Sequence, residues 1–503
     1  MLRRNVIANY AGQAWTVLIG FAFVPVYIRY LGIESFGLIG LFAMLQGWLA
    51  LLDMGMSPTL GREMARLSGG TQKPESIRDL LRSIETICLV VALVIVFGMW
   101  ASSGWLASHW LKTGSVPQPV VAQAFLLMGF VAAIRFMEGI YLSCLVGLQR
   151  QVLSNGATAL LATVRSVGIL LIFHMFGASI IVFFEWQAAM SVVTVALLAA
   201  LTYRSVPKIA RNARFSGSAL RSVGRFAGGM TGITLVGVLV TQVDKLVLSR
   251  AVTLKEFGYY SLASTVAAVI FSVVYPLARA WQPRIVQLLS SNETGALVRL
   301  YHLGSQLVAV GAGSVAAVMA LFAYQVLLLW THDPELAGKT ATVLSIIAIG
   351  NLLNGLMVLP YYLQTGAGWT RLAFLSNVVV LVFALPAIMY VAPVYRGTGV
   401  AIVWLLSNVF HLIFTINIMH QRLLRSEMRA WYVKDTIIPI VSATLAVVLV
   451  KILFRGISDG SMWQLVPLAL AGLASIAASA FSAPAVRLIV LDRIGYRRAR
   501  WAI

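Results

Sequence analysis

Long apolar runs separated by short charged or Gly- and Pro-containing segments form the main pattern of this chain. A helix needs about 20 apolar residues to cross a hydrocarbon layer about 30 Å thick. The sequence therefore predicts an all-α polytopic membrane protein with about fourteen transmembrane helices. The fourteen runs lie at residues 6–30, 36–60, 83–108, 120–147, 156–177, 180–203, 226–249, 257–281, 300–330, 340–364, 371–393, 397–420, 435–455 and 464–484.

Basic residues gather on alternate connecting segments, and this bias predicts the orientation. With a cytoplasmic N-terminus, the inward-facing segments hold 27 Lys and Arg residues and the outward-facing segments hold seven. Because cytoplasmic loops carry an excess of Lys and Arg, we expect both termini to be cytoplasmic. The first run follows Arg3 and Arg4 but ends without a small-residue cleavage site, so we interpret it as a retained helix and not as a signal peptide.

The composition excludes several classes of protein. Of the 503 residues, 60% are hydrophobic and 11% are charged, whereas soluble domains carry about 25% charged residues. A water-soluble enzyme, a disordered chain and a nucleic-acid-binding domain are therefore excluded. The net charge of +21 then reflects basic cytoplasmic loops. Cys88 and Cys144 lie inside apolar runs, so no disulfide framework is expected.

An internal repeat is visible at an offset of 221 residues. The segment 29–37 (RYLGIESFG) is similar to 250–258 (RAVTLKEFG), and the same offset relates Arg4 to Arg225. A weaker repeat relates Ser154-Asn155 to Ser376-Asn377. Chance similarity between apolar helices is the alternative. Duplication predicts two lobes of six helices, at 1–224 and 225–420, followed by helices 13 and 14 and a basic tail at 421–503.

Charged residues fall inside several of the apolar runs, where a charge costs about 2.5–3.5 kcal/mol, and five of them are candidates for a function. Arg135, Arg165 and Lys245 are candidates for cations that line an aqueous path. Asp244 and Glu138 are candidates for carriers of a coupling ion. A structural Arg135–Glu138 pair at i, i+3, and a Lys245 side chain that extends to the interface, are the alternatives.

Polar residues also recur on single helical faces. Such a face either joins helices or lines a wet path, and we expect the second. The members are Asn9, Gln13 and Thr16 in the first helix, Thr234 and Thr241 in the seventh, and Asn351 and Asn354 in the tenth.

Motifs for catalysis are not recognisable. Gly338-Lys339-Thr340 resembles the end of a phosphate-binding loop, but Asp333 occupies the position of its first glycine. His and Asp residues show no metal-binding spacing, and no nucleophilic constellation can be assembled. We therefore expect no catalytic residue, no metal and no cofactor.

Three segments carry a family resemblance: Pro25 to Gly37 (PVYIRYLGIESFG), Leu52 to Met56 (LDMGM) and Thr241 to Ser249 (TQVDKLVLS). They resemble the polysaccharide-biosynthesis or O-antigen flippase family of the multidrug/oligosaccharidyl-lipid/polysaccharide exporter superfamily. The resemblance implies two lobes around a central cavity. It also implies transport of undecaprenyl-diphosphate-linked oligosaccharide across the bacterial inner membrane, for O-antigen, capsule or exopolysaccharide synthesis. Polysaccharide polymerase and chain-length machinery are the partners that it implies, and the cavity cations would hold the diphosphate.

Two other functions remain open from the sequence. One is a small-molecule secondary exporter, such as the drug antiporters of the same superfamily. The other is a membrane-embedded glycan polymerase or ligase, for which a long external loop with catalytic residues would be expected. The external segments here are all short.

Overall fold

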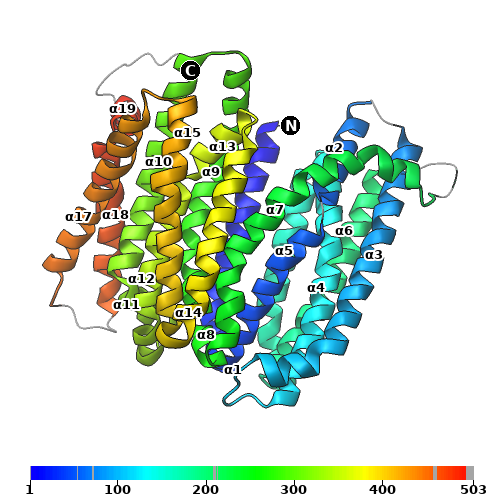
Figure 1. Ribbon diagram of the computed structural model, residues 1–503. Coiled ribbons are helices and arrows are strands. Elements are labelled where there is room, and N and C mark those ends of the chain that lie inside the picture. The colour runs from blue at the N-terminus through cyan, green and yellow to red at the C-terminus, as the bar shows by residue number, and fades with distance from the viewer. Residues whose placement is uncertain are drawn as a thin grey trace. The chain divides into compact units, whose positions relative to one another are not determined.

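The computed structural model describes residues 2–53, 55–70, 73–207, 211, 213–456 and 462–493, with their side chains except at 2–10, 50, 218–234, 462 and 493. Almost all of these residues are helical (Figure 1). Eleven continuous helical stretches are long and apolar enough to cross a membrane. Two of them contain a sharp break, at Gly32 and Arg396, and the helix Gly217–Ala251 is a further long one. The described helices therefore agree with about fourteen spans, and the chain is a multi-pass membrane protein.

The chain forms two compact units, Met1–Gly258 and Tyr259–Ile503. Compactness and internal duplication are different properties, so the lobes 1–224 and 225–420 and the segment 421–503 stay an expectation from the repeat.

Within unit 1, α3, α4, α5 and α6 run side by side, and α1 packs against both α5 and α7 (Figure 1). The helices of this unit are α1 (Leu2–Leu52), α2 (Met56–Ser68), α3 (Pro74–Trp105) with a π-helical end (Leu106–Trp110), α4 (Gln118–Gly147), α5 (Gln151–Phe176), α6 (Ile180–Ser205), α7 (Gly217–Ala251) and the start of α8 (Leu254–Ala267).

Glycine explains the break inside α1. Gly32 has φ 78° and ψ 163°, a conformation that a residue with a β-carbon rarely adopts. The break separates the first and second expected spans. It also presents Glu34, whose carboxylate accepts hydrogen bonds from the backbone N–H groups of Gly114 (2.6 Å) and Ser115 (2.9 Å).

Three expected helix boundaries were wrong. The second run was expected to continue to residue 60, but its helix ends at Leu52, and Gly55 at φ 76° starts the separate helix α2. The third helix begins at Pro74, nine residues before the apolar run, because proline at the first helical position starts a helix well. The run 300–330 contains two helices, which meet at Phe322.

Unit 2 is a second bundle, in which α10 packs against α9, α12, α17 and α18 (Figure 1). Its other helices are α9 (Val269–Ser290), α10 (Thr294–Leu321), α11 (Ala323–Thr331), α12 (Pro334–Leu356), α13 (Val358–Gly366), α14 (Thr370–Phe410), the π-helical turn His411–Thr415, α15 (Ile416–Leu423), α16 (Met428–Ala430), the π-helical segment Trp431–Ile437, α17 (Ile438–Leu453), α18 (Leu465–Ser482) and α19 (Pro484–Arg493).

A buried polar network joins α10 to the C-terminal helices. His302 contacts Glu427 (3.0 Å) and Asp435 through its two ring nitrogens. Gln306 donates to Asp435 (2.7 Å) and accepts from the backbone N–H of Ala485 (2.7 Å). Because each buried polar group has a partner, the network holds α10, the π-helical segment and α19 together.

Candidate functional site

Two arginines point into the helix bundle of unit 1. Arg135 lies in the middle of α4 and donates to the side-chain oxygen of Gln187 (2.8 Å) and to the Ser191 hydroxyl (3.4 Å). Its guanidinium carbon also lies 5.3 Å from the centroid of the Phe42 ring, a cation–π distance. The partners of this cation are therefore neutral groups.

Arg165 is the second cation, in the middle of α5. It donates to the Thr194 hydroxyl (3.1 Å), and its backbone carbonyl accepts a hydrogen bond from the Trp186 ring nitrogen (2.8 Å). The Arg165 Nε atom is buried and has no hydrogen-bond partner among the described residues. A buried guanidinium donor without an acceptor is costly, so this atom is the clearest unsatisfied feature of the site.

The two arginines lie close enough for their charges to interact. Each interacts with the charge of Glu138 and with the Tyr27 side chain, and Arg135 also interacts with Arg165. In the part of the chain that the structure describes, neither arginine forms an ion pair with a carboxylate, and Arg135 turns to α6 instead of bonding to Glu138 one helical turn away. The structure thus brings together two positive charges and one negative charge, for a net positive site.

Helix α6 supplies the polar partners of both arginines. Gln187, Ser191 and Thr194 follow one another at spacings of four and three residues, which places them on one face of the helix. Sequence reasoning missed this stripe and also Tyr27, whose side chain interacts with both arginines. The helical spacing of the three α6 residues was visible in the sequence and could have indicated a polar face.

The charged residues of α7 lie elsewhere in unit 1. Lys245 donates to the Gln242 side chain at 3.5 Å, and Gln242 packs against Gly47 of α1. Asp244 is buried, with 9% of its surface exposed. The structure therefore groups Arg135, Arg165 and Glu138, whereas the contact that it gives Lys245 is local to α7.

The expected polar face of α1 and α7 is described only in part. Gln13, Thr16 and Thr241 are exposed, and the two threonine hydroxyls bond to backbone carbonyls one turn back along their own helices. The side chains of Asn9 and Thr234 lie outside the described residues.

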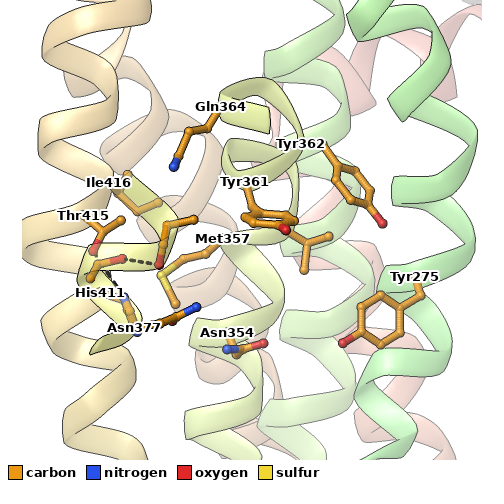
Figure 2. A pocket seen from close by; sticks show the side chains of 13 residues that line it. Tyr275, Asn354, Met357, Tyr361, Tyr362, Gln364, Asn377, His411, Thr415 and Ile416 are labelled. Atoms are coloured by element: carbon orange, nitrogen blue, oxygen red, sulfur yellow. Dashed lines mark hydrogen bonds between the residues drawn. The ribbon is translucent and has the colours of Figure 1, made fainter. Parts of the chain in front are cut away.

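The two expected amides of unit 2 have different roles. Asn351 is buried and accepts a hydrogen bond from the Trp404 ring nitrogen (3.0 Å), so it joins α12 to α14. Asn354 donates to Asn408 (2.9 Å) and lines a pocket of about 270 Å³ (Figure 2). No group of three or more metal-ligating side chains occurs among the described residues.

Comparison with known proteins relates the chain to transport and polysaccharide families. The family model "Polysaccharide biosynthesis protein" matches residues 2–289, and the MatE model matches residues 230–390. The chain is 21% identical over 403 residues to the "Putative O-antigen transporter" of Shigella flexneri. The aligned residues cover 80% of this chain and 93% of that protein.

Solved structures share the fold. The inward closed conformation of the lipid II flippase MurJ superposes with a TM-score of 0.70 at 12% identity, over 97% of this chain and 99% of that one. An inward-facing multidrug resistance MATE family transporter of the MOP superfamily gives a TM-score of 0.66 at 16% identity, over 81% and 96% of the two chains. Because the family model covers more than half of its length, the chain belongs to the polysaccharide biosynthesis protein family.

Proposed function

We propose that this protein is a flippase that carries undecaprenyl-diphosphate-linked oligosaccharide across the bacterial inner membrane by alternating access. The observation that carries the proposal is the arginine site of unit 1. It consists of Arg135 and Arg165 with neutral partners, and the Nε donor of Arg165 has no acceptor among the described residues. A net positive site between membrane helices suits an anionic lipid headgroup. The O-antigen transporter relative and the shared fold with a lipid II flippase support the same reading.

Guanidinium chemistry explains why this site suits a diphosphate. Arginine presents a planar fork of N–H donors that can bind two phosphate oxygens at once. Among the described residues, the hydrogen bonds of the Arg135 and Arg165 forks go to an amide oxygen and two hydroxyls. A diphosphate can replace these neutral acceptors with charged ones, and the α6 side chains then become free to bind water or sugar hydroxyls.

Glu138 gives the site a means of releasing its cargo. Its carboxylate interacts with both arginines across a distance longer than an ion pair. It lowers the net positive charge without occupying the donors, so binding stays moderate. A carrier that bound the diphosphate with two uncompensated cations would hold it too tightly to turn over.

The membrane potential can drive the transport. The bacterial cytoplasm is electrically negative, so outward movement of an anion gains about 2.3 kcal/mol per charge per 100 mV. Exchange for a proton or sodium ion at Asp244 or Glu138 would add to this drive. No hydrolysis of ATP is then required.

Orientation and partners follow from the same proposal. Both termini are cytoplasmic, in line with the 27 basic residues on the inward segments. The product on the outer face is a lipid-linked glycan. The polysaccharide polymerase and the chain-length machinery would act on it next. A small-molecule exporter is the alternative, favoured by the MatE match to residues 230–390. A net positive site opposes the cationic cargo of such an exporter.

Deletion of the gene tests the proposal. Cells without the protein should lose the surface polysaccharide and accumulate its lipid-linked precursor on the cytoplasmic side. The precursor is measured by extraction of lipid-linked glycans, followed by mass spectrometry. If the precursor does not form at all, the protein acts upstream as part of its synthesis, and the flippase proposal is wrong.

A further inference from the structure

The pocket of unit 2 is lined by uncharged polar groups, and several of their donors and acceptors have no partner among the described residues. It is an open pocket, lined by residues of α9, α12, α13, α14, the π-helical turn and α15. Figure 2 shows Asn377, Met357 and His411 on one side of the view, and Tyr275 and Tyr362 on the other. Its volume of about 270 Å³ is near the lower end of small-ligand pockets, roughly 300–1,000 Å³. That size suits one ring and not a whole oligosaccharide.

Three tyrosines give the pocket aromatic faces with polar tips. The Tyr361 and Tyr362 rings lie 5.9 Å apart between centroids, and Tyr362 interacts electrostatically with Tyr275. Tyr275 is 43% exposed and Tyr361 is 38% exposed, so both rings are accessible to a ligand. None of the three hydroxyls makes a hydrogen bond among the described residues. Each can therefore donate one and accept others.

Amide and imidazole groups supply further donors and acceptors to the pocket. Asn377 has no hydrogen-bond partner in the described part of the chain, although it lines the pocket. Asn354 uses its N–H₂ group on Asn408 (2.9 Å), which leaves its carbonyl oxygen for a ligand. His411 bonds to Thr415 through Nδ1 (3.2 Å), and its Nε2 atom is unused among the described residues. Polar groups in a concave, largely apolar site fix the orientation of a ligand.

The side chains that line the pocket limit the class of ligand that can bind there. Among the residues that the structure describes, no Asp, Glu, Lys or Arg lines the pocket. A phosphate therefore has no cation to bind there, and a cationic drug has no carboxylate. A pyranose ring fits both features, because its flat carbon–hydrogen face packs on an aromatic ring and its hydroxyls both donate to and accept from amides and phenols.

We infer that this pocket binds one sugar ring of the transported glycan. The inference rests on the proposed function for its source of ligand, but the binding itself depends only on the residues of unit 2. The transported substrate would then be recognised by two kinds of chemical group. Cations of unit 1 hold the diphosphate, which every such substrate shares, and neutral groups of unit 2 select the sugar.

The test uses the full-length protein, purified in detergent, and a panel of free neutral hexoses, 6-deoxyhexoses and N-acetylhexosamines. Saturation-transfer NMR measures contact between the protein and the ring protons of each sugar. Transfer to at least one sugar is expected, and it should fall at least fivefold in Asn377→Leu and in Tyr361→Ala. Tyr390→Ala is the matched control, because Tyr390 lies on the same helix as Asn377, is 77% exposed and is outside the pocket.

Inorganic pyrophosphate separates this inference from the proposed function. Asn377→Leu should keep the pyrophosphate affinity of the wild type, and Arg165→Ala should keep the sugar contact. Failure of the wild-type protein to bind pyrophosphate, or equal pyrophosphate affinity in Arg165→Ala and the wild type, would contradict the diphosphate site alone and leave the sugar subsite standing. Absence of transfer to every sugar of the panel, or an equal signal in Asn377→Leu, Tyr361→Ala and the wild type, would overturn the sugar subsite. Displacement of the sugar by the lipophilic cation tetraphenylphosphonium, at a lower concentration than any sugar needs, would also overturn it.

Discussion

Gly37 packs so closely on Leu254 that a β-carbon at position 37 would lie 2.6 Å from the Leu254 carbonyl oxygen. The reciprocal contact also exists, because a β-carbon at Gly258 would lie 2.3 Å from the carbonyl oxygen of Ile33. Positions 33 and 37 become 254 and 258 at the offset of 221 residues. The two contacts therefore join the two segments that the repeat relates, and the internal duplication stays a prediction from the sequence.

The first prediction concerns this glycine pair. Gly37→Ala and Gly258→Ala should each destabilise the protein by about 1–3 kcal/mol, the usual cost of overpacking. The measurement is thermal unfolding of the purified protein in detergent. Gly20→Ala is the matched control, because a β-carbon at Gly20 meets no atom within 4 Å, and alanine favours a helix. Equal melting temperatures for all four proteins would show that the contact is not tight.

Most of the helices could be predicted from the sequence, because spans of about 20 apolar residues have no other stable state in lipid. The ends of the helices could not. Helix α3 begins at Pro74, and its first turn contains the charged residue Glu75. The hydropathy pattern therefore placed this turn outside the helix. The break at Phe322 leaves no mark in the apolar run that contains it.

The two arginines of the candidate site could be predicted from the sequence, but the side chains that contact them could not. Arg135 and Arg165 were visible as charges in lipid-spanning runs, and the structure brings them together. Their partners Gln187 and Thr194 come from another helix, and the packing of α4 and α5 against α6 determines them. No spacing within one helix can indicate such a contact.

The second prediction tests the orientation with single cysteines. Gly114→Cys and Gly338→Cys should react with an impermeant thiol reagent added outside, whereas Ser290→Cys should react only after permeabilisation. All three positions are exposed. Cys88 and Cys144 are both buried, so they provide an unreactive background. Labelling of Ser290→Cys in intact cells, or of the other two only in permeabilised cells, would contradict the proposed topology.

The third prediction concerns pH and the connection between α15 and α16. A hydrogen bond from the Ser426 hydroxyl, and then one from His302, holds the pKa of the Glu427 carboxyl below its usual range. A lowered pKa means that the folded state favours the charged carboxylate. This contribution is therefore complete above about pH 4.3, the ordinary value for Glu, and is lost as the pH falls through the folded-state pKa.

Glu427→Gln should accordingly have a lower melting temperature than the wild type at pH 7, and the difference should shrink on acidification below about pH 4.3. Thermal unfolding in detergent at a series of pH values measures it. Glu185→Gln serves as the control, since Glu185 is exposed. A difference between Glu427→Gln and the wild type that stays constant from pH 7 to pH 3 would show that this carboxylate does not stabilise the fold.

The most direct test of the central claim is glycan export divided by membrane abundance in Arg165 variants. Arg165→Ala removes the guanidinium whose Nε is buried and has no partner among the described residues, and it should reduce export at least tenfold while the protein remains in the membrane. Arg165→Lys should keep part of the activity, because the charge survives and the bidentate geometry does not. Arg204→Ala, at an exposed position at the end of α6, should export normally. Normal export by Arg165→Ala, or a loss fully matched by disappearance of the protein from the membrane, would contradict the proposal that this arginine binds the diphosphate.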